Sequence, residues 1–279
     1  MYLTRHQTAD GARWAVDGRF LPAAFELGLA LQLPAAAIPG LLQAMPRGAL
    51  ATGPLLAPVE PTQEIWASGV TYLRSREARE AESTVKDVYA RVYDAKRPEL
   101  FWKAIGWRVV GHEGPIRVRD DSAWNVPEPE LTLVVNAHRE IVGFCVGNDV
   151  SSRDIEGENP LYLPQAKVYE GSCALGPGLS LQAPDTLRDL PIEIVILREG
   201  RPAFEGSTRT GQIKRPLEEL VEYLGKELDF PRGVFLMTGT GIIPPHDFSM
   251  KRGDRVRITI GSLTLENDVA RTPSARRAP

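Results

Sequence analysis

Two apolar runs joined by a short polar connection constrain the fold of this chain more than any other feature. Residues 131–135 read Leu-Thr-Leu-Val-Val, and residues 140–147 read Glu-Ile-Val-Gly-Phe-Cys-Val-Gly. Apolar, β-branched runs of this length favour strands. The connection at 136–139 is short enough to turn the chain back on itself, which predicts an antiparallel hairpin.

Three carboxylates lie at the open end of this predicted hairpin. Glu128 and Glu130 are two apart on a strand, so they are expected to stand side by side, and Asp149 ends the second run. Adjacent carboxylates repel, and one takes up a proton unless a cation separates them. Oxygen ligands without a Cys or His cluster favour a hard cation, Mg²⁺ or Mn²⁺ before Zn²⁺. The alternative, two surface acids on an edge strand, is disfavoured by the apolar run that follows.

Bulk composition narrows the class of protein. The 279 residues are 43% hydrophobic and 25% charged, which allows one large domain or a main domain with a small companion. A net charge of −3 does not favour nucleic acid or an acidic membrane surface. No signal peptide or membrane-spanning run is expected, and two cysteines without a CxxC pair suit a reducing compartment. We therefore expect a soluble cytoplasmic protein with neither nucleic-acid nor membrane partners.

The pattern of the chain changes near residue 60. Residues 1–60 combine a short hairpin, Ala- and Leu-rich helices and a Pro-rich connector, and are predicted to form a small N-terminal domain. Residues 61–279 are mainly short strands, with helices predicted over 74–81, 87–93 and 216–228. Many strands with few helices predict an α+β, mostly β fold without the regular alternation of a Rossmann fold or TIM barrel.

Three other polar residues are candidates for chemistry, each with a structural alternative. Arg153 either neutralises the acids in a salt bridge or holds a substrate carboxylate with its planar guanidinium. Lys167 stabilises an oxyanion only if it shares a pocket with the metal, and is otherwise a surface lysine. Thr240 lies in a Gly-rich turn that either closes a strand or holds a small anion.

Four sequence motifs, in the order in which they occur along the chain, resemble those of the fumarylacetoacetate hydrolase superfamily. The shared features are a Glu-x-Glu pair, an Asn-Asp-x-Ser-x-Arg-Asp segment at 148–154, a lysine at 167 and a Thr-Gly-Thr turn at 238–240. The resemblance covers about residues 64–269. It implies a mixed β-roll catalytic domain behind a small N-terminal α/β domain, in a homodimer or homotetramer. It also implies Mg²⁺, with Mn²⁺ or Ca²⁺ as substitutes, held by the three acids Glu128, Glu130 and Asp149.

One departure from the hydrolytic members of this superfamily bears on the reaction. Those members carry Tyr-x-x-His-x-x-Glu on a lid, where the His and Glu activate water. Here Tyr72 is followed at that spacing by Ser75 and Ala78. Because a dehydration needs no activated water nucleophile, the missing histidine points away from hydrolysis.

Three further stretches, at 69–79, 92–99 and 158–165, are similar to sugar-acid dehydratases of the same superfamily. The implied activity is a hydro-lyase reaction on a small 2-keto sugar acid. A 2-keto-3-deoxy pentonate of the D-arabinonate or xylonate type would lose water to give 2,5-dioxopentanoate, in non-phosphorylative pentose degradation.

The implied reaction gives each candidate residue a role. Lys167 is assigned to enolate charge or proton transfer, and Thr240 to the substrate carboxylate. Glu99, Ser75 and Arg76 are assigned to proton shuttling and to the distal hydroxyls. Two alternatives stay open: an acylpyruvate hydrolase or oxaloacetate decarboxylase on the same metal site, and a catalytically silent ligand-binding protein.

Overall fold

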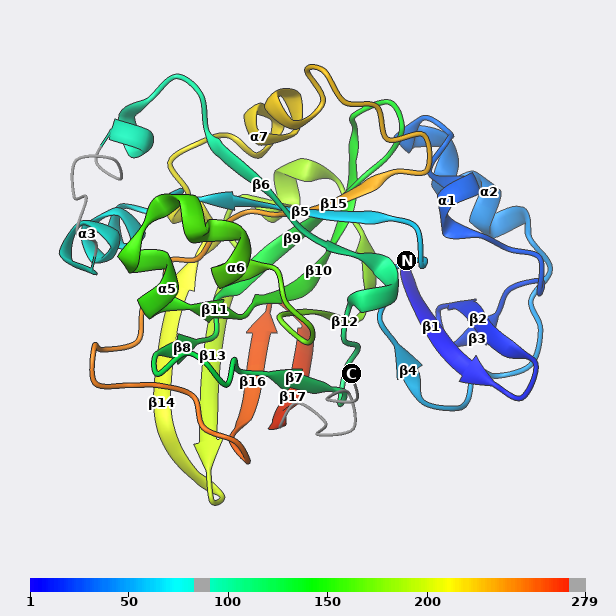
Figure 1. The fold of residues 1–279 in the computed structure, drawn as a ribbon. Coiled ribbons are helices and arrows are strands. Elements are labelled where there is room, and N and C mark those ends of the chain that lie inside the picture. The colour runs from blue at the N-terminus through cyan, green and yellow to red at the C-terminus, as the bar shows by residue number, and fades with distance from the viewer. Residues whose placement is uncertain (83–90, 271–279) are drawn as a thin grey trace, which may run out of the picture.

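The strands form two large sheets and one small one in the computed structural model, which describes residues 1–82 and 91–270. Figure 1 shows the larger sheet across the middle of the molecule and the five-stranded sheet below it. The path through the larger sheet is β3-β2-β1-β12-β10-β9-β15-β5-β6, with β4 paired to β1. Its strands are β1 (Tyr2–Thr8), β2 (Gly11–Val16), β3 (Arg19–Phe20), β4 (Leu55–Leu56), β5 (Glu64–Gly69), β6 (Glu99–Ile105), β9 (Pro129–Val135), β10 (Ile141–Asp149), β12 (Cys173–Leu181) and β15 (Val234–Met237).

The second sheet has the order β14-β13-β16-β17-β7, and a separate pair joins β11 to β8. The strands of these two sheets are β7 (Pro115–Arg117), β8 (Asn125–Val126), β11 (Ser151–Ser152), β13 (Pro191–Arg198), β14 (Arg201–Arg209), β16 (Arg255–Ile260) and β17 (Leu263–Ala270). The named α-helices are short, namely α1 (Leu27–Ala30), α2 (Ile38–Ala44), α3 (Leu73–Glu82), α5 (Arg153–Glu158), α6 (Leu163–Lys167) and α7 (Leu217–Leu224). The predicted α+β, mostly β fold is therefore confirmed.

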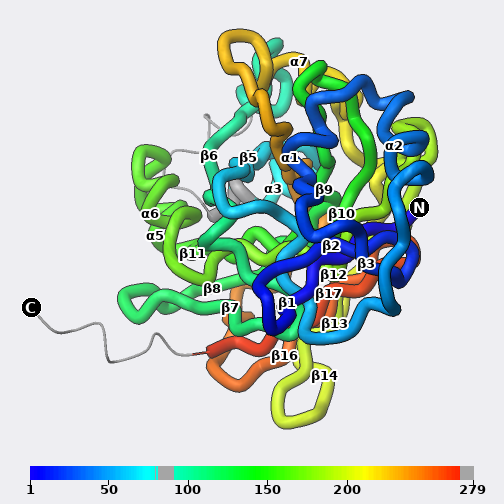
Figure 2. The backbone as a smooth tube through the Cα atoms, turned by 90° about the vertical axis from the view of Figure 1, so that its right-hand side faces the viewer, coloured from blue at the N-terminus to red at the C-terminus, as the bar shows by residue number. Residues whose placement is uncertain are grey.

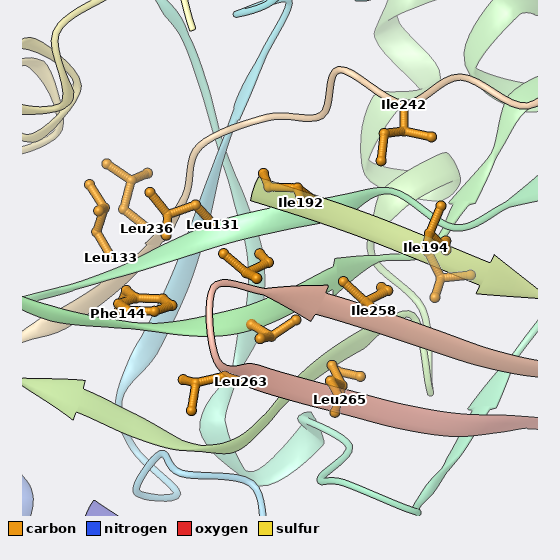
Figure 3. Close-up of a cluster of buried hydrophobic side chains, with 14 of the residues drawn as sticks. Leu131, Leu133, Phe144, Ile192, Ile194, Leu236, Ile242, Ile258, Leu263 and Leu265 are labelled. Carbon is orange, nitrogen blue, oxygen red and sulfur yellow. The ribbon is translucent and has the colours of Figure 1, made fainter. Parts of the chain in front are cut away.

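The main hydrophobic core fills the space between the two large sheets. Figure 3 shows Leu131 and Leu133 of β9 in one cluster with isoleucines of β13 and β16. The next residue along β9, Val134, belongs to a second core on the other face of the larger sheet. Burial on both faces explains why the run at 131–135 is apolar except at Thr132, which is also buried.

The predicted central hairpin is confirmed, and one predicted helix ends earlier than expected. Strands β9 and β10 pair antiparallel, with Val135 opposite Ile141 next to the connection. The helix predicted over 216–228 ends at Leu224, because Gly225 has a low helix propensity and forms the C-cap. Of the helix predicted over 87–93, residues 87–90 lie outside the described residues.

The N-terminal strands extend the larger sheet. Strand β1 pairs antiparallel with β12, so that Leu3 lies opposite Leu179. Figure 2 shows these first strands beside β12, whereas α5 and α6 lie together on another side of the molecule. The second core joins N-terminal residues such as Trp14 to Phe235 of β15. The domain boundary at residue 60 stays a prediction. Within the described ranges, no helix combines the length and apolarity needed to cross a membrane.

Candidate active site

The central hairpin brings three carboxylates together at one end. Glu128 directly precedes β9, Glu130 lies within it, and Asp149 ends β10. The backbone of Asp149 is aligned with that of Glu128, because the Asp149 N–H donates to the Glu128 carbonyl at 3.0 Å. One oxygen of each carboxylate lies within 4.8 Å of the others, and all three side chains are buried. Their oxygens form a set of hard ligands suited to Mg²⁺.

The turn after β15 contributes a backbone donor to this cluster. Gly239 has a φ of +88°, and its N–H donates to Glu130 Oε2 at 2.6 Å. A Cβ at this glycine would lie 2.1 Å from Thr71 Oγ1, so the close approach requires glycine. The backbone donor therefore holds one Glu130 oxygen in place.

Lys167, at the end of α6, is buried against two of the three acids. Its Nζ lies 2.9 Å from Glu128 Oε2 and 3.3 Å from Asp149 Oδ2. It also donates to Ser151 Oγ at 2.6 Å. The lysine shares the pocket with the acids, which is the condition that its oxyanion role required.

A second lysine, which the sequence reasoning missed, faces the same cluster. Lys103 is 0% exposed and its Nζ forms an ion pair with Asp149 Oδ1. It also donates to the carbonyls of Val150 at 3.1 Å and Lys167 at 2.5 Å. The available signal was a lysine inside the otherwise apolar stretch Leu100–Ile105 of β6.

Arg153 forms the salt bridge that was one of its two predicted roles. It begins α5, is 2% exposed, and its Nη2 lies 3.0 Å from Glu128 Oε1. Both oxygens of Glu128 therefore face cations, one from Arg153 and one from Lys167.

The electrostatics of Glu130 favour a bound cation. Burial raises the pKa of its carboxyl well above the usual value, and the charges of Asp149 and Glu128 raise the pKa further. Lys167 and the Gly239 N–H oppose this shift. A divalent ion among the three carboxylates would oppose this shift, because its positive charge favours the ionised form of each ligand.

Glu128, Asp149 and Lys167 line a cavity together with most of the other residues predicted to contact the substrate. Its described lining consists of Ser68, Gly69, Val70, Ser75, Glu99, Phe101, Glu128, Asp149, Glu156, Lys167, Gly239 and Thr240. A larger cavity of about 660 Å³ lies elsewhere, and among its described lining residues Glu170 is the one carboxylate. The acids and the buried lysine make the smaller cavity the candidate active site.

The cavity contains three candidates besides the acids and Lys167. The Thr240 hydroxyl accepts a hydrogen bond from the Ile242 N–H at 3.2 Å. Ser75, in the first turn of α3, donates to the Tyr72 carbonyl at 2.7 Å. Glu99, at the start of β6, lies against Gly69, where a Cβ would come within 2.1 Å of Glu99 Oε2.

Arg76 is placed differently from the expectation. It is absent from the described lining of the cavity. Its guanidinium pairs with Glu80 at 3.3 Å and lies over the ring of Tyr93. One helical step separates Arg76 from Ser75, so the two side chains point in different directions.

Comparison with known proteins identifies the family of this chain. Residues 64–270 match the family model described as fumarylacetoacetate (FAA) hydrolase C-terminal. The chain is 47% identical over 211 residues to a probable 2-keto-3-deoxyxylonate dehydratase of Haloferax volcanii, covering 74% of this chain and 72% of that protein. It is 44% identical over 213 residues to a 2-dehydro-3-deoxy-D-arabinonate dehydratase of Saccharolobus solfataricus, covering 74% of this chain and 70% of the relative.

A solved structure of a similar protein also matches this chain over nearly its full length. A 2-keto-3-deoxy-D-arabinonate dehydratase complexed with magnesium and 2,5-dioxopentanoate superposes with a TM-score of 0.82 at 35% identity. The superposition covers 98% of this chain and 99% of that one. Since the family model spans most of the chain and a relative is 47% identical over 72% of its own length, the chain belongs to the fumarylacetoacetate hydrolase family.

Proposed function

We propose that this protein is a Mg²⁺-dependent hydro-lyase that converts a 2-keto-3-deoxy pentonate, of the D-arabinonate or xylonate type, to 2,5-dioxopentanoate. The observation that carries this proposal is the buried triad of Glu128, Glu130 and Asp149, two of whose members, Glu128 and Asp149, line a cavity together with Lys167. The names of the relatives, both dehydratases of such acids, support it.

The chemistry of the substrate fits the ligands of the cavity. A 2-keto acid has a carboxylate and a ketone oxygen, two hard donors that complement a cation held by three carboxylates. Bound Mg²⁺ would polarise the ketone and make the protons on carbon 3 more acidic. Loss of one such proton and of the carbon-4 hydroxyl gives water and a keto acid with a C3=C4 double bond. A proton shift from carbon 5 to carbon 3 then gives an enol, and transfer of the enol proton from oxygen to carbon 4 gives 2,5-dioxopentanoate.

The residues around the acids are suited to the negative charge of this reaction. We assign Lys167 to the enolate, because its buried ammonium lies beside two of the ligands. Arg153 orients Glu128 through their salt bridge. Thr240 is assigned to the substrate carboxylate. Its hydroxyl accepts from the Ile242 N–H at 3.2 Å and donates to the Ile242 carbonyl over 3.5 Å, a long bond that a substrate carboxylate at shorter range would replace.

The distal end of the substrate has its own candidates. Glu99 and Ser75 line the cavity, and we assign them to proton transfer at carbon 5 and to the distal hydroxyl. Arg76 takes part only if it leaves its contacts with Glu80 and Tyr93.

Dehydration accounts for the cavity better than hydrolysis. No histidine belongs to the described lining, and Ser75 stands three residues after Tyr72, at the spacing where the hydrolytic members carry their histidine. The Ser75 hydroxyl is already bonded to the backbone of Tyr72. A serine held in this way does not replace an imidazole as the base that activates water.

The direct test is an assay for 2,5-dioxopentanoate from both carbon-4 enantiomers of 2-keto-3-deoxy pentonate, with Mg²⁺ and with chelator. Carbon 4 is the one stereocentre left in these acids, so the two enantiomers cover the substrate class. Product that depends on Mg²⁺ supports the proposal. No product from either enantiomer, or release of pyruvate from an acylpyruvate or oxaloacetate instead, refutes it.

The proposal includes an assembly and a location. The family resemblance implies a homodimer or homotetramer, and two cysteines without a CxxC pair suit the cytoplasm. Light scattering of the purified protein measures the number of subunits, and a single-subunit mass refutes that part of the proposal.

A further inference from the structure

Glu156 is a buried carboxylate in the candidate active site that lies outside the acid triad. It belongs to α5, is 4% exposed and lines the cavity. Its Oε2 lies 4.0 Å from Lys167 Nζ. A carboxylate is seldom buried to this degree without a structural or chemical role.

The helix that carries Glu156 faces the metal ligands. Arg153 and Glu156 are three residues apart, so they share one face of α5. Arg153 contacts Glu128, and Glu156 faces Lys167, which contacts both Glu128 and Asp149. Glu156 is therefore one side chain away from two of the carboxylates that would hold the cation.

The other groups near the ligands are poorly suited to remove a proton from carbon. Lys167 has donors directed at Glu128, Asp149 and Ser151, and an ammonium has three donors and no lone pair. The triad itself is needed for the cation. Among the described lining residues, two carboxylates remain, Glu99 and Glu156. Glu99 is only half-buried and lies against Gly69, whereas Glu156 lies next to Lys167.

We propose that Glu156 is a catalytic residue that removes the carbon-3 proton and then delivers it to the leaving hydroxyl. This inference rests on the dehydratase function proposed above. The Glu156 carboxylate takes the proton, and the electron pair of the C3–H bond forms the C2=C3 bond of the enolate. The ketone then re-forms, the pair makes the C3=C4 bond, the C4–O bond breaks, and the hydroxyl leaves as water with the proton of Glu156. The carboxylate is thereby regenerated.

The step can be isolated with 2-oxopentanoate, which has carbon-3 protons and no carbon-4 hydroxyl. In D₂O with Mg²⁺, the wild-type protein is expected to exchange these protons for deuterium, as followed by NMR. Glu156→Gln is expected to exchange at least about 100-fold more slowly and to dehydrate the pentonate at a similarly reduced rate. Its melting temperature and its Mg²⁺ affinity by calorimetry are expected to stay near those of the wild type.

The matched control is Glu158→Gln, an exposed residue of the same helix, which is expected to exchange like the wild type. Should Glu156→Gln not fold, Glu156→Asp keeps the charge beside Lys167 and withdraws the oxygens. Slower exchange in that variant supports the proposal, and a wild-type rate overturns it.

Three other results also overturn the proposal. They are an unchanged exchange rate in Glu156→Gln, a loss of dehydration with exchange retained, and no exchange by the wild-type protein. Failure of the overall function is a distinct result, because the wild-type protein would then exchange 2-oxopentanoate but form no 2,5-dioxopentanoate.

Discussion

Replacing Lys103 by methionine tests whether the buried charges beside the acid triad stabilise the fold. Methionine keeps a similar unbranched length and removes the ammonium. The variant loses the ion pair with Asp149 and the hydrogen bonds to the carbonyls of Val150 and Lys167. Because Lys103 is 0% exposed, water cannot replace these partners.

The contacts give the magnitude of the effect. Removing one partner of a buried ion pair costs about 3–5 kcal/mol. Two remaining contacts reduce the loss, since Asp149 keeps Lys167 Nζ at 3.3 Å and the Lys167 carbonyl keeps the Ser172 hydroxyl at 2.9 Å. We therefore expect the lower end, about 3 kcal/mol in the free energy of unfolding without metal. For a chain of this size the melting temperature would fall by roughly 6–12 °C.

Urea unfolding with chelator, and again with saturating Mg²⁺, measures this loss. The loss should be smaller with Mg²⁺, because a bound cation supplies positive charge beside Asp149. The exposed Lys226→Met variant is the control and should unfold like the wild type. A loss below about 1 kcal/mol for Lys103→Met would refute the reasoning, because the buried pair would then contribute no more than a surface pair.

Three other measurements test the site. The pKa of Glu130 is raised in the folded protein, so the stability of the metal-free protein should fall as the pH rises from the pKa of the unfolded state, near 4.5, through the pKa of the folded state. Mg²⁺ should therefore raise the melting temperature more at pH 8 than at pH 5.5. Glu130→Gln should remove this pH dependence, and an unchanged profile would exclude Glu130 as its source. Thr240→Val should raise KM for the keto acid about tenfold with little change in kcat, the effect of one hydrogen bond to a charged group; an unchanged KM would show that its hydroxyl does not contact the substrate. Gly239→Ala should lower the free energy of unfolding by more than about 1 kcal/mol, because its φ is +88° and its Cβ would meet Thr71; wild-type stability would show that the turn can shift.

Much of the central fold could be predicted because its signals are local. The apolar runs at 131–135 and 140–147 form the hairpin β9–β10, because two strands joined by a short connection pair antiparallel. The same hairpin carries the acids, so the spacing of Glu128, Glu130 and Asp149 was enough to predict their meeting. The helix ending at Leu224 was placed less well, because apolar periodicity does not mark the residue at which a helix stops.

The remaining site residues depend on contacts between distant segments. Lys103 lies 46 residues before Asp149 in the sequence. The two form an ion pair because the fold places β6 next to the end of β10, where Lys103 also donates to the carbonyl of Lys167 in α6. Arg76 could not be separated from Ser75 by sequence, since one helical step turns a side chain away from the cavity. Glu156 resembles any acid in a short polar helix until the fold brings it next to Lys167, which contacts the triad.

The sequence alone therefore determined the acid triad and the hairpin that holds it, because strand alternation and a short turn act over a few residues. Only the tertiary structure decided which lysines are buried with the triad, that Arg153 pairs with Glu128, and that Glu156 faces the cavity. Those outcomes depend on burial, which is a property of packed elements and is not encoded in the spacing of any one of them.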